Sequence, residues 1–390
     1  MFGIYLHIPF CLRRCKYCDF ITYAGKEKFM PGYFAALINE LRHQAKNLQN
    51  FPRQVDTVFF GGGTPSLMKG EWIETLIDCI RSEYGLAKHA EISLEANPGT
   101  LDQKLTAKLL KAGVNRLSIG VQSFADCDLV LLGRIHNSSQ AVESIHSARQ
   151  AGFKNISLDL MFGIPGQSLA GWKSNLQQAL ALQPDHLSLY SLILEPGTQL
   201  FDDVQSGKLQ PVSEDLSADM YELAMDLLVE KGFSHYEISN WSRGKDYEAQ
   251  HNKIYWKNQA YLGVGAGAHS SLNGLRIANT SSIEYYINRM SNIHSAEKGN
   301  FPAAVETLTL DPYTMQQETM MLGMRLTREG VSDQEFTDRF GNRIVDVFPK
   351  ELERILARKL VQWRTFPDGP HLVLTRGGIL LGNQVFQEFV

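Results

Sequence analysis

One pattern repeats through about the first 200 residues: a short apolar run, a turn containing Gly or Pro, and an amphipathic segment. The runs that we expect to form strands are GIYLHI, VDTVFF, EISLEA, RLSIGV, NISLDLMF and HLSLYSLI. Helical periodicity lies between them over residues 33–48, 71–84, 103–112, 141–151 and 169–182. Alternating strands and helices make parallel sheets, so the pattern predicts an α/β fold, either an open doubly wound sheet or a partial (β/α)6 barrel.

Polar or glycine-rich turns follow nearly every expected strand. Their sequences are GGGTP, EANP, GVQS, GIPG and EPGT. Barrel enzymes build their sites from the turns at the carboxyl ends of the strands, and so these turns favour the barrel.

The regular alternation stops near residue 200. A helical pattern over residues 216–231 leads to the segments HYEISNWS and HNKIYWKNQAYLGVGAGAHS, which we interpret as a site-bearing extension of the barrel. From residue 282 the pattern is mostly helical and ends in two apolar runs, LVQWRTF and HLVLTRGG. We therefore expect a barrel with its extension over residues 1–281 and a small, mostly helical, winged-helix-like domain over residues 282–390.

Composition excludes several classes of protein. The net charge of −4 gives no basic footprint for nucleic acid. No apolar run approaches the roughly 20 residues that span a bilayer, and MFGIYLHIPFC lacks the basic start of a signal peptide. We expect a cytoplasmic protein, with peripheral attachment at the inner face of the membrane as a second option.

Three of the five cysteines, Cys11, Cys15 and Cys18, stand within eight residues. An odd count clustered in this way indicates a metal site and not a disulfide framework. A structural zinc site needs a fourth ligand nearby, which is missing. Iron–sulfur clusters are normally held by four thiolates, so three predict a 4Fe-4S cluster with one iron open to a small molecule. A zinc knuckle or three unrelated thiols is the alternative.

The segment Cys11-Leu-Arg-Arg-Cys15-Lys-Tyr-Cys18, directly after an expected strand, resembles the motif of radical S-adenosylmethionine (SAM) enzymes. In that family SAM chelates the open iron, and an electron from the cluster cleaves it to methionine and a 5'-deoxyadenosyl radical. The resemblance implies a cluster on these three cysteines and SAM as a second cofactor.

A longer set of motifs resembles the anaerobic coproporphyrinogen III dehydrogenase family: YLHIPF, GGGTPS, EANPGT, GVQSF, LGRIH and DLMFGIPGQ. Glycines after a strand let backbone groups approach a ligand, and carboxylates or an arginine at strand ends suit an ammonium, a ribose or a carboxylate. The resemblance implies that Tyr17 contacts adenine. It implies the following SAM-binding set, any member of which has a structural role as its alternative: Tyr5, Tyr17, Gly62, Gly63, Thr64, Glu95, Gln122, Arg134 and Asp159.

The chain departs from the dehydrogenases in the cysteine loop, where Phe20 stands in place of their additional cysteine. The first expected strand also starts at residue 2, so we expect no N-terminal lid. Instead, HNKIYW resembles the HNxxYW motif of heme chaperones related to those dehydrogenases. Imidazole is a common ligand of heme iron, so the resemblance implies that His251 contacts heme.

Tyr255 and Trp256 would then pack on the macrocycle, and His269 is a second ligand candidate. The alternative is a His251 satisfied inside the protein, with both aromatic rings as ordinary core. The glycines of GVGAG lack the helix and the acidic residue of a dinucleotide site, so we expect them to permit close backbone packing.

Two functions follow as expectations. The first is a heme chaperone that binds heme and passes it to an acceptor protein, membrane-bound or respiratory, and that can form a homodimer. The second is an oxygen-independent coproporphyrinogen III dehydrogenase. A radical SAM enzyme acting on an unrelated small molecule is the remaining alternative.

Overall fold

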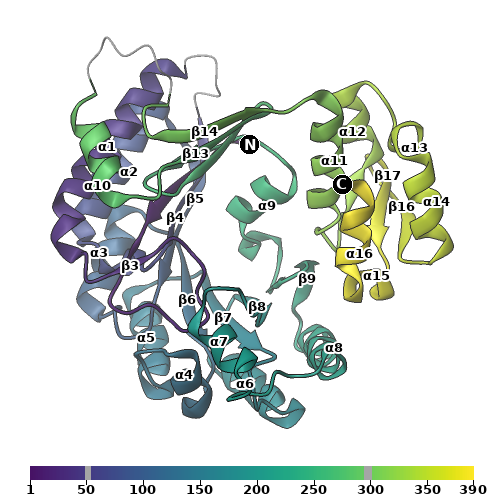
Figure 1. Cartoon of the computed structure of the whole chain (residues 1–390), viewed down its shortest axis with the longest axis horizontal. Helices are drawn as coiled ribbons and strands as arrows, with labels where there is room; N and C mark the ends of the chain where they lie inside the picture. The colour runs from purple at the N-terminus through teal and green to yellow at the C-terminus, as the bar shows by residue number, and fades with distance from the viewer. Residues whose placement is uncertain (49–53, 294–300) are drawn as a thin grey trace.

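A computed structural model describes residues 1–48, 54–293 and 301–390. One 12-stranded sheet runs through the larger part of the molecule (Figure 1). Its strands, in spatial order, are β14 (Ala304–Thr309), β13 (Leu275–Asn279), β12 (His269–Leu272), β11 (Tyr261–Val264), β1 (Gly3–Ile8), β4 (Val55–Gly62), β5 (Leu86–Ala96), β6 (Arg116–Gln122), β7 (Ile156–Phe162), β8 (His186–Ser191), β10 (Asn240–Ser242) and β9 (Ser234–Glu237).

The six strands from β1 to β8 are parallel and follow one another in sequence order. A doubly wound sheet reverses direction at a switch point, whereas a barrel winds one way. The partial barrel is therefore confirmed and the open-sheet alternative is wrong. The helices on its convex face are α1 (Met30–Asn47), α2 (Gly70–Tyr84), α3 (Gln103–Ala112), α5 (Ser138–Ala151) and α6 (Leu169–Ala181). Helix α4 (Asp126–Leu132) lies beside the cysteine loop, where the Leu132 carbonyl accepts a hydrogen bond from the Lys16 backbone N–H.

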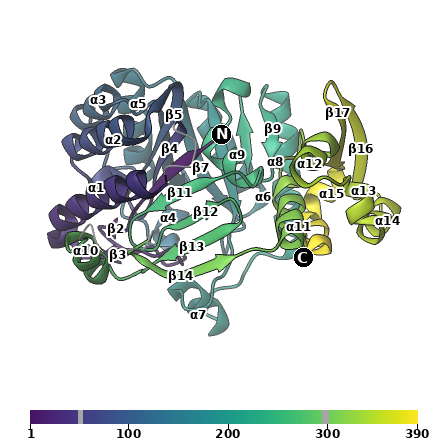
Figure 2. The same cartoon turned by 90° about the horizontal axis from the view of Figure 1, so that it is seen from above.

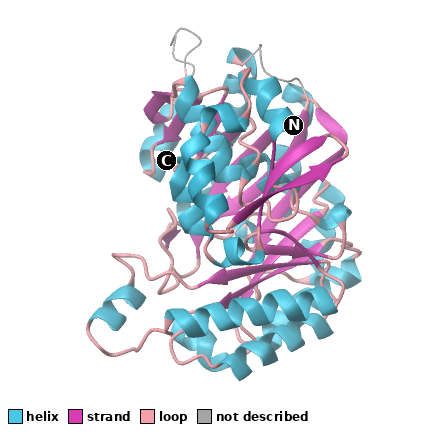
Figure 3. Ribbon diagram, turned by 90° about the vertical axis from the view of Figure 1, so that its right-hand side faces the viewer, coloured by secondary structure: helices cyan, strands magenta, loops and turns pink. Residues whose placement is uncertain are grey.

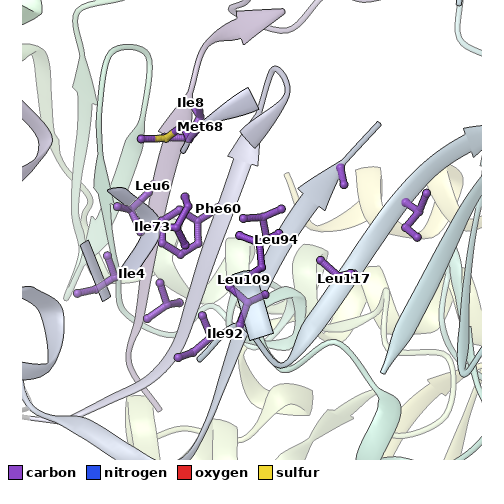
Figure 4. Packing of buried hydrophobic residues seen from close by; sticks show 14 of the residues in the cluster. Ile4, Leu6, Ile8, Phe60, Met68, Ile73, Ile92, Leu94, Leu109 and Leu117 are labelled. Carbon is purple, nitrogen blue, oxygen red and sulfur yellow. The ribbon is translucent and has the colours of Figure 1, made fainter. Parts of the chain in front are cut away.

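Side-chain alternation separates the core from the site. In β1, Ile4, Leu6 and Ile8 are fully buried beneath the helices, where Figure 4 shows them beside Phe60 and Leu94 of neighbouring strands. Successive strand residues point to opposite faces of a sheet. The intervening positions of the same strands therefore face the concave side, which is where polar residues of the motifs stand.

Local signals fix the ends of the helices. Asp102 accepts a hydrogen bond from the backbone of Leu105 to start α3. Asn137 and Gln140 form a reciprocal capping box at the start of α5. Gly113 and Gly152 end these two helices in the left-handed conformation, with φ of 105° and 107°.

The extension continues the sheet at both edges of the barrel, with β11 beside β1 and β10 beside β8. It contains α7 (Gln199–Gln205), α8 (Glu214–Glu230), β9, β10 and α9 (Gln250–Trp256), together with β11 and β12. Figure 1 shows α9 within the concave opening, and Figure 3 shows a row of helices along one side of the strands. Short strands β2 (Phe10–Cys11) and β3 (Tyr23–Ala24) pair across the base of the cysteine loop.

The C-terminal part carries a separate hydrophobic core that begins at Met320. Its three-stranded sheet packs with helices at one end of the molecule (Figure 2). The elements are α11 (Pro312–Gly323), β15 (Val331–Ser332), α12 (Asp333–Phe340), α13 (Ile344–Val347), α14 (Pro349–Ala357), β16 (Val361–Phe366), β17 (Gly369–Leu374), α15 (Arg376–Leu380) and α16 (Gly382–Phe386). Along the chain the order is one helix, one strand, three helices, two strands and two helices, and the winged-helix-like domain stays a prediction.

Residues after 282 do not all belong to this second core. Helix α10 (Ile283–Ser291) buries Ile283, Tyr286 and Met290 in the barrel core, and β14 pairs with β13. We therefore propose that the domain boundary falls near residue 310, later than the division expected at 282. No helix in the three described stretches is long and apolar enough to cross a membrane.

Candidate functional site

The concave face carries a cavity of about 480 Å³ at the carboxyl ends of the strands. Alternation brings its wall together, because Glu95, Ser118 and Asp159 occupy the inward positions of β5, β6 and β7. The predicted residues that line it are Cys11, Cys15, Tyr17, Cys18, Gly62, Gly63, Glu95, Gln122, Arg134 and Asp159.

The three cysteines of the loop are all unpaired. Burial raises the pKa of the Cys11 thiol, while a hydrogen bond from Thr64, whose Oγ1 lies 3.6 Å from the Cys11 Sγ, lowers it. The thiols of Cys18 and Cys15 raise it further, so the three lie within electrostatic reach of one another. Thiolates next to a metal are deprotonated outright, and these donors fit an iron–sulfur cluster.

No compact group of three His, Cys, Asp or Glu side chains suited to a single metal ion is found in the described part of the chain. The cysteines thus stand as separate donors around the cavity. A cluster of several irons binds each thiolate at a different iron, which separate donors can satisfy.

Glycine is required at the end of β4, where this strand meets the cysteine loop. A Cβ on Gly63 would lie 2.7 Å from the Phe10 carbonyl oxygen and 3.0 Å from the Cys11 Sγ. Gly62 has φ of 111°, and its Cβ would meet the His7 ring at 2.5 Å. The GGG turn therefore allows the loop to approach the strand, as glycines in strands commonly do.

Two half-buried carboxyl groups face the cavity. Glu95 accepts a hydrogen bond of 3.0 Å from the Gly62 backbone N–H, and Asp159 accepts bonds of 2.9 and 3.1 Å from the Ser118 hydroxyl. Burial, reinforced by the charge of Asp159, raises the pKa of Glu95 to about 8. Burial also raises the pKa of Asp159. A cationic ligand would reverse both shifts, so the site suits an ammonium or sulfonium group.

Arg134 ties the cysteine loop to the barrel. Its Nη1 donates to the Cys15 Sγ at 3.3 Å, and its Nη2 donates to the Gly120 carbonyl at 2.8 Å and to the Asn97 side chain. Nearby Gln122 has φ of 67°, an unusual conformation for a residue with a side chain. Strained backbone at a cavity wall is typical of functional sites.

Two members of the predicted SAM-binding set stand outside the wall of this cavity. The Tyr5 hydroxyl is 2.9 Å from His7 Nδ1. Thr64 is buried and contacts Cys11 and Asn97. In this arrangement the side chains of Tyr5 and Thr64 therefore contact neighbouring protein groups.

The HNKIYW segment forms α9, and its histidine is fully buried. His251 Nδ1 lies 2.7 Å from Thr57 Oγ1, and its Nε2 lies 2.8 Å from the Tyr255 hydroxyl. Burial lowers the pKa of His251 to about 3. Asn252, and not His251, lines the cysteine cavity. His269 is exposed at the start of β12.

Sequence reasoning missed several residues of the site. Arg116 is buried on the cavity wall, and its Nε has no hydrogen-bond partner among the described residues. Ser118 supports Asp159, and His7 Nε2 lies 2.8 Å from the Ile21 carbonyl beyond the cysteine loop. Inward alternation on strands already recognised could have found the first two.

Similarity to known families agrees with this geometry. Residues 5–178 match the Radical SAM superfamily model, and residues 310–381 match the HemN C-terminal domain model. Coproporphyrinogen III oxidase (HemN) from Escherichia coli, described as a radical SAM enzyme, superimposes with a TM-score of 0.83 at 22% identity, over 100% of this chain and 89% of that one. Fold and cysteine loop thus define a radical SAM protein.

Relatives of higher sequence identity narrow the class of protein. The heme chaperone HemW of Bacillus subtilis is 38% identical over 100% of this chain and 99% of its own. Heme chaperone HemW of Escherichia coli K12 is 42% identical over 69% of this chain and 70% of its own. The chain belongs to the HemW family of heme chaperones.

Proposed function

We propose that this chain binds heme and transfers it to an acceptor protein, and that it carries a 4Fe-4S cluster and SAM. The observation that carries the proposal is similarity to HemW chaperones over the whole chain. The cavity adds support, because it brings three thiols and two carboxyls to one wall. A membrane-bound or respiratory acceptor and a homodimer remain parts of the proposal.

Different residues of the cavity would hold the cluster and SAM. Cys11, Cys15 and Cys18 would ligate the cluster, which supplies one open iron and an electron. Glu95 and Asp159 would take the positive groups of SAM or its ribose, and Tyr17 its adenine. Because Arg134 already donates to the Cys15 sulfur, its first role is to offset negative charge at the cluster.

The second candidate function is the dehydrogenase. The HemN fold covers the whole chain, but at 22% identity it supports the fold alone. Phe20, which stands where the dehydrogenases carry a cysteine, lines the cavity and is 65% exposed. An apolar ring at this position supplies no thiol chemistry, which favours the chaperone.

Heme ligation by His251 would require the histidine to give up its existing contacts inside the protein. Both ring nitrogens already have partners inside the protein, so the ring would have to leave Thr57 and Tyr255 and α9 would have to move. Heme contact by another part of the motif is therefore the simpler arrangement.

The test is anaerobic reconstitution of the full-length protein, followed by titration with heme and incubation of the loaded protein with a heme-free acceptor. Cys18→Ser should lose the iron–sulfur absorption, and Cys127→Ser, at an exposed cysteine that is not part of the loop sequence, should keep it. Stoichiometric heme binding with transfer supports the chaperone. No heme binding, together with protoporphyrinogen formation from coproporphyrinogen, SAM and reductant, would establish the dehydrogenase instead.

A further inference from the structure

An open groove of about 330 Å³ lies next to the cysteine cavity. Asp19 and Phe20 line both spaces, whereas the other residues of the groove stand outside the cysteine cavity. Tyr255 of the HNKIYW segment and His269 of β12 also line the groove, so three distant parts of the sequence meet there. Its volume lies within the range of small-molecule sites, about 300–1,000 Å³.

Two glycines of the GVGAG segment bring the start of β12 to this place. Gly267 has φ of 80°, and a Cβ there would lie 2.8 Å from the Ile21 Cδ1. Gly265 has φ of 112°, and its Cβ would lie 2.7 Å from the His7 carbonyl oxygen. These glycines therefore permit close packing on β1 and on the end of the cysteine loop, two residues before His269.

The lining of the groove is rich in aromatic rings. The rings of Tyr255 and Tyr261 meet edge to face, with centroids 4.6 Å apart. Phe20 is largely exposed at the rim, and Ile21 beside it is half-buried. Exposed apolar side chains that gather in one place mark a binding surface. These side chains suit a flat, apolar ring system.

His269 is the histidine of the groove that can offer a ring nitrogen to a ligand. The other histidine, His7, has both nitrogens occupied, with Nδ1 2.9 Å from the Tyr5 hydroxyl and Nε2 2.8 Å from the Ile21 carbonyl. The His269 side chain is exposed, and its imidazole forms no hydrogen bond within the described stretches. Imidazole is a common ligand of heme iron.

The remaining polar groups at the groove are less suited to iron. Burial raises the pKa of Tyr255 and of Tyr261, so both phenols stay protonated at neutral pH. Among the described lining residues, Asp19 carries the only carboxylate. Arg14 brings a positive charge to the same loop, where its Nη2 donates to the Phe20 carbonyl at 3.5 Å. Carboxylate side chains of a ligand would therefore point toward Arg14 and solvent, away from Asp19.

We propose that this groove is the heme-binding site of the chain, with the His269 imidazole bound to the iron and the macrocycle against Phe20 and Tyr255. The inference rests on the proposed function, which supplies heme as the flat, apolar ligand that carries iron. An open groove covers one face of the macrocycle and leaves the other face accessible to an acceptor. His251 then acts as a positioning residue, because its Nε2 lies 2.8 Å from the Tyr255 hydroxyl.

The experiment is an absorption titration of the full-length, cluster-loaded protein with heme. His269→Ala should weaken binding about tenfold or more and change the heme spectrum, because the iron loses its protein ligand. Phe20→Ala should weaken binding about threefold or more and keep the spectrum, since it removes apolar contact alone. The matched control is His146→Ala, an exposed histidine of α5 outside the groove, which should bind heme like the wild type.

Protoporphyrin without iron separates a bond to iron from a general loss of the groove. Wild type and His269→Ala should bind this porphyrin with equal affinity, whereas Phe20→Ala should bind it more weakly. Heme binding by His269→Ala within about twofold of wild type, or with an unchanged heme spectrum, would overturn the groove as the site and leave the proposed function intact. Equal weakening of heme binding by His146→Ala, or of porphyrin binding by His269→Ala, would also overturn it. A wild type that binds no heme would overturn the proposed function and this inference together.

Discussion

Replacing His251 by Ala should destabilise the protein strongly, whatever happens to heme. The imidazole is fully buried, stacks on Phe59 at a centroid distance of 5.2 Å, and has hydroxyl partners on both nitrogens. Truncation of a large buried side chain costs about 2–5 kcal/mol. Leaving the hydroxyls of Thr57 and Tyr255 without this partner adds about 1 kcal/mol or more. We expect the free energy of unfolding to fall by about 3–5 kcal/mol.

The pH dependence of the free energy of unfolding tests whether the buried imidazole of His251 is the cause of this loss of stability. Burial lowers the pKa of His251 from 6.5 to about 3, so below pH 6.5 the unfolded chain takes up a proton that the folded protein excludes. The wild type therefore loses stability as pH falls from 6.5 toward 3, and His251→Ala does not lose this share. At pH 5 the gap between the two proteins should be smaller by about 2 kcal/mol than at pH 7.5.

Urea unfolding of the cluster-free protein at pH 7.5 and pH 5 measures both effects. His269→Ala is the matched control, because that histidine is exposed, and it should change stability by less than about 0.5 kcal/mol. A loss below about 1 kcal/mol for His251→Ala, or a gap that stays constant with pH, would refute the buried, neutral histidine. Heme titration of this variant has meaning only when corrected for the folded fraction.

Two further predictions concern the cysteine cavity and the extension. Because burial and Asp159 raise the pKa of Glu95 to about 8, the carboxyl must lose a proton to take the ammonium of SAM, and affinity for SAM should rise about tenfold from pH 6 to pH 7, where the ammonium itself stays protonated. The rise should vanish in Glu95→Gln, and a flat wild-type profile in isothermal titration would contradict this assignment. Gly263→Ala would place a Cβ 2.0 Å from the His269 carbonyl oxygen and should cost at least about 2 kcal/mol in thermal unfolding, whereas Gly244→Ala, with open space around it, should cost under about 0.5 kcal/mol. Equal melting temperatures for the two glycine variants would show that the strands near Gly263 can separate freely.

The barrel was predictable because its signals are local. Buried parallel strands are nearly continuous apolar runs, and their order along the chain becomes their order in the sheet. The end of the sheet was not predictable in this way. The side chains of β14 are largely exposed, so its sequence shows no alternation, and it joins the sheet only by pairing with β13. That long-range pairing also places residues after 282 beside the barrel.

The same distinction between local and long-range signals applies to the candidate site. Motifs with short spacing gather in one cavity, because turns that follow parallel strands meet at one edge. Partners from distant segments could not be read from the motifs: Ser118 supports Asp159, and Thr57 meets His251 across 194 positions of sequence. A motif indicates the kind of chemistry available, while the direction of each side chain depends on the whole fold.

The HNKIYW segment is an example of a motif whose side chains have different surroundings in the fold. Asn252 and Trp256 are one turn apart on this seven-residue helix, and yet Asn252 lies on the wall of the cysteine cavity and Trp256 on the wall of a second cavity, which Met1 and Arg339 also line. His251 precedes Asn252 on the helix and links α9 to β4 through its contact with Thr57. At 1.5 Å of rise per residue, Asn252 and Trp256 are about 6 Å apart along the helix axis. A substitution at the histidine therefore disturbs the walls of both cavities, and loss of heme binding after such a change does not require a bond between imidazole and iron.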